Sequence, residues 1–190
     1  MQNAEGIPVS ATLPGESPAC CPGVAEQSWY AVYVKSRHEF VAYEEMQRKG
    51  IEAFLPSVKK MSQWKDRRKL IEYPLFPGYV FVRPQSAAGA HLAVLKTRGV
   101  VAFISLERAM PTPVDPCEIA SLKLLSGSGR ELDIYPNLKE GMRVRLKHGP
   151  LKDAEGFLSK REHEYLFYVN VELLGRSVAV KIAAEDIEAL

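Results

Sequence analysis

The residues best suited to do chemistry in this sequence are aromatic, and the chemistry they suit is binding. Four large aromatic side chains fall within nine residues of the stretch YPLFPGYVFVRP: Tyr73, Phe76, Tyr79 and Phe81. Clustered rings favour association by burying apolar area, and they supply no strong nucleophile. Three prolines and one glycine punctuate the stretch, which predicts turns around a short strand.

The strand predicted at residues 79–83 has two apolar faces. Aromatic and β-branched residues dominate it, as is typical of strands. Because strand side chains alternate, Tyr79 and Phe81 point to one face while Val80 and Val82 point to the other. Either the strand is buried on both sides or one face is left for a partner, and the stretch alone leaves both interpretations open.

No arrangement typical of catalysis accompanies these rings. The sequence has no phosphate-binding glycine loop, no nucleophile elbow and no group of His, Cys and carboxylate residues at ligand spacing. Cys20 and Cys21 are adjacent and Cys117 stands alone, an odd number that favours reduced thiols in a cytoplasm. We expect a non-enzymatic, cytoplasmic protein without a metal or another cofactor.

Charge is unevenly distributed along the 190 residues, although the net charge is only +2. Residues 1–28 contain three acidic and no basic residues, and their Pro, Gly, Ser and Glu content predicts a disordered tail. Residues 29–125 contain 15 Lys and Arg against 9 Asp and Glu, which favours a polyanionic partner. No apolar run approaches the ~20 residues of a membrane span, so we expect no membrane contact.

The Ser- and Gly-rich segment 126–137 predicts a linker between two domains. In residues 29–125 the predicted order is β-α-β-β-β-α-β-α. Ser36 and Glu39 suggest a capping box for the first helix, and Gly50 suggests its end. The basic stretch 59–69 predicts a hairpin, either solvated or in contact with nucleic acid or a protein. Asp115 and Pro116 suggest the start of the last helix.

The predicted fold class is α+β, with one antiparallel sheet that carries helices on one face and leaves its other face partly open. After the linker, residues 138–190 contain four short alternating stretches separated by turns. Their spacing predicts a small β-barrel.

Several motifs together resemble the NusG family of transcription elongation factors, over residues 29–188. They are WYAVYVKS, PLFPGYVFV, LKTRGVVAFI and EGMRVRLKHGPLKDAEGFL. PLFPGYVFV corresponds to the signature of the family's N-terminal (NGN) domain, and GMRVRLKHGPLKDAEG corresponds to its KOW motif. The long N-terminal tail and LLGRSVAV are closer to specialised paralogues such as RfaH, UpxY and LoaP than to the general factor.

The resemblance implies that the N-terminal domain binds the β′ clamp helices of RNA polymerase through an apolar surface. The matching residues, called here the aromatic patch, are Tyr33, Phe76, Tyr79 and Phe81. Aromatic anchors of this kind contribute roughly 2 kcal/mol or more each. We expect the patch to be open or only lightly covered, and the C-terminal domain to be a β-barrel rather than a helical hairpin.

The resemblance also implies contact with upstream or non-template DNA. The matching positions are Lys35, Arg48, Thr97 and Arg98, with Arg37 and Lys49 as charged neighbours. The last turn of any helix favours basic residues, so Arg48 and Lys49 have an equally good structural explanation.

In the C-terminal domain, Gly149, Pro150 and Gly156 are expected to form the KOW turn. Asp153 replaces a usual glycine, and Asp tolerates left-handed backbone geometry fairly well. The resemblance leaves open contacts with a small-subunit ribosomal protein and with termination factor Rho.

The expected function is that of a monomeric factor that increases polymerase processivity, and opposes termination, on a particular operon. Two alternatives remain. One is the general elongation factor itself. The other is a KOW protein that binds RNA or the ribosome and never acts on polymerase.

Overall fold

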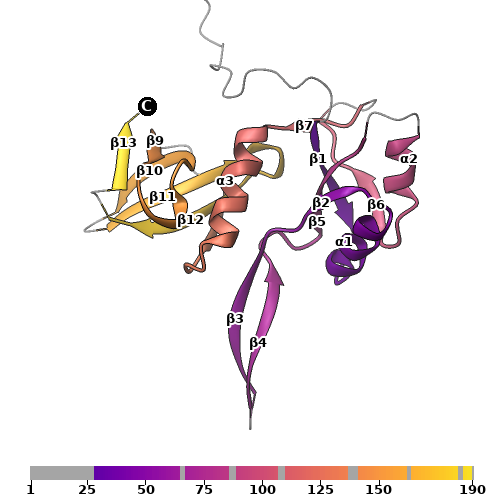
Figure 1. The fold of residues 1–190 in the computed structure, drawn as a ribbon, viewed down its shortest axis with the longest axis horizontal. Helices are drawn as coiled ribbons and strands as arrows, with labels where there is room; N and C mark the ends of the chain where they lie inside the picture. The colour runs from indigo at the N-terminus through magenta and orange to yellow at the C-terminus, as the bar shows by residue number, and fades with distance from the viewer. Residues whose placement is uncertain are drawn as a thin grey trace, which may run out of the picture.

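A computed structural model describes residues 28–64, 67–85, 89–106, 110–136, 141–161, 164–183 and 186–189. The tail predicted at residues 1–28 therefore lies, apart from Ser28, outside the described residues. The described part forms two larger antiparallel sheets, a separate two-stranded hairpin and three α-helices (Figure 1). The α+β class expected from the sequence is confirmed.

The N-terminal sheet has the strand order β2-β5-β1-β6, with β7 also paired to β1. Its strands are β1 (Trp29–Val34), β2 (Glu52–Phe54), β5 (Tyr79–Arg83), β6 (Val100–Phe103) and β7 (Pro113–Val114). The helices are α1 (Glu39–Arg48), α2 (Ala90–Leu95) and α3 (Pro116–Gly127). The predicted aromatic strand is thus β5, an interior strand of this sheet.

The two faces of the N-terminal sheet are covered by different helices. On one face Val32, Val34, Val80 and Val82 pack in one core cluster with α1 and α2 residues: Ala42, Met46 and Val94. The alternate positions Trp29, Ala31 and Phe81 belong to another cluster, together with three residues of α3: Ile119, Leu122 and Leu125. Helices α1 and α2 share a face as predicted, but α3 lies on the opposite face. The expectation of helices on one face only is therefore wrong for α3.

Local signals place α3 correctly. The Asp115 carboxylate accepts a hydrogen bond from the Cys117 N–H at 2.8 Å, and Pro116 occupies the first helical position. On the N-terminal sheet side, the Lys123 ammonium lies 4.5 Å from the centre of the Trp29 ring and 3.8 Å from a carboxylate oxygen of Glu52. A cation over an aromatic face is attracted by the ring quadrupole, which helps to hold α3 on the sheet.

The first helix begins differently from the prediction. No side-chain cap is made at its N-terminus, so the predicted capping box of Ser36 and Glu39 is wrong. The Glu39 carboxylate is buried and accepts a hydrogen bond from the Gly78 N–H at 2.8 Å. This long-range bond ties α1 to the turn before β5. The positive φ of Gly50 (72°) follows the last residues of α1, as its capping role predicts.

The predicted basic hairpin is present as β3 (Ser57–Trp64) and β4 (Arg67–Pro74). These strands pair with each other in register from Ser57↔Pro74 to Trp64↔Arg67 and form a sheet of their own. Figure 1 shows the hairpin projecting away from the rest of the described chain.

The C-terminal part is an antiparallel sheet with the order β13-β9-β10-β11-β12-β8. Its strands are β8 (Asp133–Pro136), β9 (Met142–Leu146), β10 (Glu155–Arg161), β11 (Glu164–Val171), β12 (Arg176–Ile182) and β13 (Ile187–Ala189). Two short 3-10 turns, η1 (Gly149–Leu151) and η2 (Glu172–Leu174), connect them. Residues 164–171, the segment for which a helical hairpin was the alternative, are strand. Strand β8 falls inside the predicted linker and pairs with β12, so residues 133–136 belong to this sheet.

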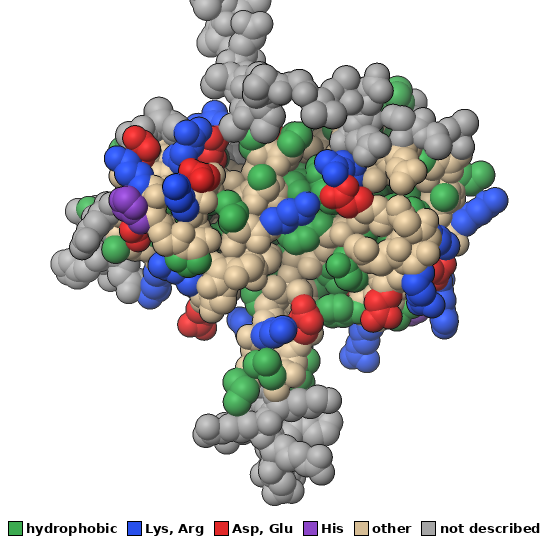
Figure 2. All heavy atoms as spheres, in the orientation of Figure 1, with side chains coloured by type: hydrophobic (Ala, Val, Ile, Leu, Met, Phe, Trp, Pro, Cys, Tyr) green, Lys and Arg blue, Asp and Glu red, His purple; other side chains and the backbone are tan. Residues whose placement is uncertain are grey.

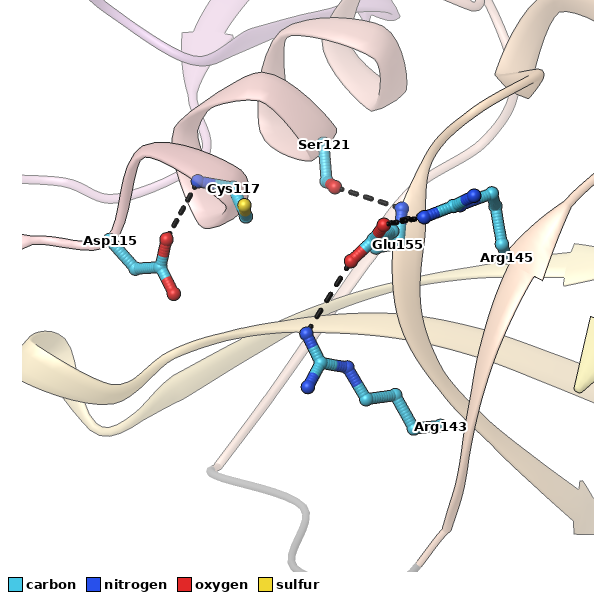
Figure 3. A network of polar contacts seen from close by, with 6 residues as sticks. All are labelled: Asp115, Cys117, Ser121, Arg143, Arg145 and Glu155. Carbon is cyan, nitrogen blue, oxygen red and sulfur yellow. Dashed lines mark hydrogen bonds and ion pairs between the residues drawn. The ribbon is translucent and has the colours of Figure 1, made fainter. Parts of the chain in front are cut away.

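Helix α3 lies between the two sheets (Figure 1). On the C-terminal side, the Ser121 hydroxyl accepts a hydrogen bond from the Glu155 N–H at 3.1 Å (Figure 3). The Glu118 carboxylate accepts one from the Glu172 N–H at 3.4 Å. The core cluster that contains the apolar residues of α3 also includes Val144, Phe167 and Val178 of the C-terminal strands. One continuous core therefore runs from the N-terminal sheet through α3 to the C-terminal sheet.

The half-buried position of Glu118 makes this contact sensitive to pH. Burial raises the pKa of Glu118 to about 7, and the nearby Asp115 and Glu172 carboxylates add to the rise. A raised carboxyl pKa means that the folded state favours the protonated form. The associated stability is complete below the ordinary pKa of 4.5 and is lost as the pH rises through about 7.

We therefore expect Glu118→Gln to raise the urea midpoint of unfolding at pH 8 and to leave it nearly unchanged at pH 4.5. The amide stays neutral and keeps an acceptor for the Glu172 N–H. The exposed Glu131→Gln serves as a control and should not alter the difference between the two pH values. An equal effect of Glu118→Gln at both pH values would contradict this explanation.

Candidate functional site

Two tyrosines form the exposed part of the aromatic patch. Tyr33 of β1 and Tyr79 of β5 are direct cross-strand partners, with ring centroids 5.8 Å apart. Tyr33 is 43% exposed and Tyr79 is half-buried. On the other side of β1, Tyr33 pairs with the exposed Ala102 of β6. The two rings, called here the tyrosine pair, thus lie beside a small residue on an open end of the sheet.

The turn before β5 positions the tyrosine pair. Gly78 has φ = 86°, a left-handed value that favours glycine, and its carbonyl oxygen accepts a hydrogen bond from the Val34 N–H at 2.8 Å. A Cβ on Gly78 would lie 3.2 Å from a ring carbon of Tyr33. The Glu39 carboxylate accepts a hydrogen bond from the N–H of the same glycine. The PG dipeptide therefore lets the turn pass close to the Tyr33 ring.

The other two members of the aromatic patch are buried. Phe76 and Phe81 are both 0% exposed, and their ring centroids are 6.0 Å apart in an edge-to-face arrangement. The Phe54 ring stacks on Phe81 at 6.2 Å. The expectation that all four rings lie bare is therefore wrong for Phe76 and Phe81. The physical reason is α3, which covers the part of the sheet face that carries Phe81.

On this face of the sheet, side-chain exposure changes from one cross-strand pair of β1 and β5 to the next. The pair Ala31↔Phe81 is buried with α3, whereas in the next pair on the same face Tyr33 is exposed and Tyr79 is half-buried. The buried phenylalanines thus lie behind the tyrosine pair and fix the backbone from which it projects. A surface held in this way loses little conformational freedom when it binds.

A basic cluster adjoins the tyrosine pair. Lys35 directly follows β1, two residues after Tyr33. Its N–H donates a hydrogen bond to the Gly99 carbonyl at 2.8 Å, and this bond brings the neighbouring Arg98 close to Lys35. The side chains of Lys35 and Arg98 are exposed, as is that of Arg48 at the end of α1. Three of the four residues proposed from the sequence for DNA contact are therefore accessible to a polyanion.

Thr97, the fourth residue of that set, is only 3% exposed. Its hydroxyl donates to the Ala93 carbonyl at 3.1 Å and accepts from the Lys49 ammonium at 3.0 Å. The expectation of a direct DNA contact by Thr97 is therefore wrong in this conformation. Instead the hydroxyl closes the last turn of α2 and helps to hold Lys49.

Lys49 also bonds to Glu45, with an N–O distance of 2.7 Å. This contact is the main reason that the pKa of Glu45 lies below its ordinary value. A second carboxylate oxygen of Glu45 accepts a hydrogen bond from the Arg98 N–H at 3.2 Å. Glu45 thus links α1 to the Arg98 segment, a role that sequence spacing gave no means to detect.

The KOW turn residues occupy different backbone environments. Gly149 has φ = 76° and Pro150 follows it in η1, whereas Gly156 lies inside β10. A Cβ on Gly156 would lie 2.5 Å from the Tyr168 carbonyl oxygen and 2.8 Å from the Phe167 ring. Gly156 is required by close approach of neighbouring groups, rather than by a tight return. Asp153 has φ = 66°, which agrees with the left-handed geometry expected for it.

Next to this turn, Glu155 accepts from two arginines of β9 (Figure 3). The Arg145 Nε–Glu155 distance is 3.2 Å and the Arg143 Nη2–Glu155 distance is 3.4 Å. The peptide N–H of the same glutamate bonds to Ser121 of α3. Arg143 and Glu155 line one wall of a cleft of about 740 Å³ between the β7–α3 segment and the C-terminal sheet.

Over the described ranges, no group of three or more His, Cys, Asp and Glu residues is placed to hold a metal ion. No helix within those ranges is both long and apolar enough to cross a membrane. The side chains brought together at the surface are aromatic and basic. They define an α+β binding protein with a separate C-terminal β-sheet.

Comparison with known proteins identifies the family. The family model described as "Transcription termination factor nusG" matches residues 27–123, about half of the chain. This chain belongs to the NusG family.

Individual relatives match over nearly their whole length. A transcription termination/antitermination protein NusG from Borreliella burgdorferi is 25% identical over 182 residues, which cover 86% of this chain and 99% of that protein. The corresponding protein of Bacillus subtilis is 26% identical over 178 residues, which cover 87% of this chain and 99% of that protein. A solved structure titled "Domain interaction in Thermotoga maritima NusG" is 22% identical, with a TM-score of 0.48, and covers 88% of this chain and 99% of that one.

The close packing at Gly156 gives a stability prediction. We expect Gly156→Ala to lower the free energy of unfolding by about 1–3 kcal/mol, because backbone and a buried ring must shift to admit the methyl group. Gly127→Ala at the end of α3 is the matched control, since a Cβ there has nothing within 4 Å. Urea unfolding of both variants measures the difference. Equal effects would contradict the close-approach explanation.

Proposed function

We propose that this protein is a transcription elongation and antitermination factor that docks on the β′ clamp helices of RNA polymerase through the tyrosine pair. The observation that supports this most directly is the exposure of Tyr33, paired with the half-buried Tyr79, beside the exposed basic side chains of Lys35 and Arg98. Membership of the NusG family supports the choice of polymerase as partner.

The physical basis for docking is an apolar surface with a polar margin. Tyrosine rings bring a large apolar area and keep a hydroxyl for hydrogen bonding at the edge of a contact. Anchors of this type carry much of the binding free energy at protein interfaces. Phe76 and Phe81 act in this proposal as buried support, not as direct contacts.

Docking needs no prior opening of the protein. Tyr33 remains 43% exposed with the C-terminal sheet in place against α3. The C-terminal sheet contacts α3 through hydrogen bonds to Ser121 and Glu118 and through a shared apolar core. The factor is therefore proposed to bind polymerase without the release of a masking domain.

The basic cluster is proposed to contact upstream or non-template DNA next to the docked polymerase. Phosphate contacts by Lys35, Arg48 and Arg98 would supply binding that depends on salt and not on base sequence. Holding the clamp closed while touching DNA increases processivity by disfavouring pauses. No bond-making residue takes part in this mechanism.

We expect the double variant Tyr33→Ala, Tyr79→Ala to weaken binding to a purified RNA polymerase elongation complex by at least about 100-fold. Each lost anchor removes roughly 2 kcal/mol, and every 1.4 kcal/mol is tenfold in affinity. The matched control is Leu92→Ala, Leu95→Ala, which removes two exposed apolar side chains from α2. Unchanged binding of the tyrosine variant would favour a KOW protein that binds RNA or the ribosome without acting on polymerase.

The proposed scope is one operon, because the long N-terminal tail and LLGRSVAV resemble specialised paralogues. The general elongation factor is the second candidate, and it is favoured by the curated relatives, which are NusG proteins at 24–27% identity. Genome-wide occupancy separates the two. Occupancy confined to one transcription unit supports the specialised role, and occupancy of most units refutes it.

A further inference from the structure

The β3–β4 hairpin has no role in the proposed function, although its construction is unusual. Its strands pair only with each other among the strands that the structure describes, and the ladder continues to Trp64↔Arg67. Figure 1 shows the β3–β4 hairpin, called here the arm, projecting from the rest of the described chain. A two-stranded hairpin by itself is only marginally stable in water, so an extended one gains most from a partner.

Positive charge is concentrated in this hairpin. Residues 57–74 contain six Lys and Arg against two Asp and Glu, a net charge of +4. Since the whole chain carries +2, the remaining 172 residues carry −2. The Lys59 and Lys60 side chains, on consecutive residues of β3, are exposed. The arm is therefore the most basic segment of a chain that is otherwise slightly acidic.

Exposed apolar side chains accompany this charge. Met61 is 62% exposed and Leu70 is 55% exposed, and the two are direct cross-strand partners. Figure 2 shows apolar side chains beside a basic one on the described part of the arm. A hairpin that served only as a solvated loop would have no need of two exposed apolar groups at opposed positions. Their combination with basic neighbours fits a partner that offers both phosphate groups and apolar edges.

We propose that the β3–β4 hairpin is a second nucleic-acid-binding element, separate from the Lys35–Arg98 cluster, that enters the major groove of B-form DNA. The major groove of B-DNA admits a two-stranded β-ribbon, and its edges present thymine methyl groups to apolar side chains. In this arrangement Lys59 and Lys60 contact phosphates, and Met61 and Leu70 contact the groove edge.

The shape of the arm favours DNA over duplex RNA. The major groove of A-form RNA is deep and narrow, so a two-stranded β-ribbon does not enter it. Duplex RNA of the same length is therefore expected to bind through charge alone. The proposal holds whether or not the tyrosine pair docks on polymerase, because the DNA contact is made by the free protein.

The test uses the full-length protein and fluorescein-labelled duplex DNA, with binding measured by anisotropy over a series of salt concentrations. The double variant Lys59→Ala, Lys60→Ala should reduce the slope of log affinity against log salt by about 2, since each phosphate contact contributes about 0.9. The matched control removes two exposed lysines of the C-terminal part, Lys152→Ala and Lys181→Ala, and should leave the slope unchanged. An unchanged slope for the hairpin variant, or an equal loss in the control, would overturn the proposal.

A second pair of variants tests the groove contact. Met61→Ser, Leu70→Ser should weaken binding to duplex DNA several-fold at constant salt slope and leave binding to duplex RNA unaffected. Equal losses on DNA and RNA, or no loss on DNA, would refute major-groove entry. Because all four hairpin substitutions replace exposed side chains, circular dichroism should show an unchanged fold. Lys35→Ala, Arg98→Ala should leave the effects of the hairpin variants intact if the two elements act separately.

Discussion

The packing of α3 against the N-terminal sheet is the constraint on which the other features depend. Ile119, Leu122 and Leu125 share a core with Phe81 and Trp29, so this half of the sheet face is closed to solvent. Because the helix covers only part of the face, the ladder continues beyond it to Tyr33 and Tyr79. The opposite side of the same helix receives the C-terminal sheet through Ser121. One helix thus decides which aromatic rings are exposed and where the second sheet lies.

Features fixed by neighbouring residues could be predicted from the sequence. The start of α3 at Asp115 and Pro116, the helix end at Gly50 and the left-handed Asp153 all follow from local backbone preferences. The strand 142–146 and the basic hairpin follow from residue type and alternation. The strands that carry the tyrosine pair, β1 and β5, follow from residue type and alternation in the same way.

Features fixed by distant partners could not be predicted in this way. Glu39 has the spacing of a capping residue, but the Gly78 N–H, 39 positions away, provides a buried partner instead. Residues 133–136 fall in a segment with the composition of a linker, but they form a strand because they pair with β12. Alternation put Phe81 on the correct face but gave no information on which helix covers that face. Thr97 likewise matches a DNA-contacting position in the sequence, and its burial is explained only by its contacts with Ala93 and Lys49.

The continuous core described around α3 also affects how the chain unfolds. Many two-domain proteins lose structure in separate steps because few apolar contacts cross between their domains. Here one core contains apolar residues of α3 together with Phe167 and Val178 of the C-terminal strands, so separation of the C-terminal sheet would expose apolar side chains of that core. The cost of exposing that surface couples the two halves, and their melting transitions should merge into one cooperative event. A polymerase-bound factor of this construction would carry its C-terminal sheet at a set orientation, rather than on a free tether.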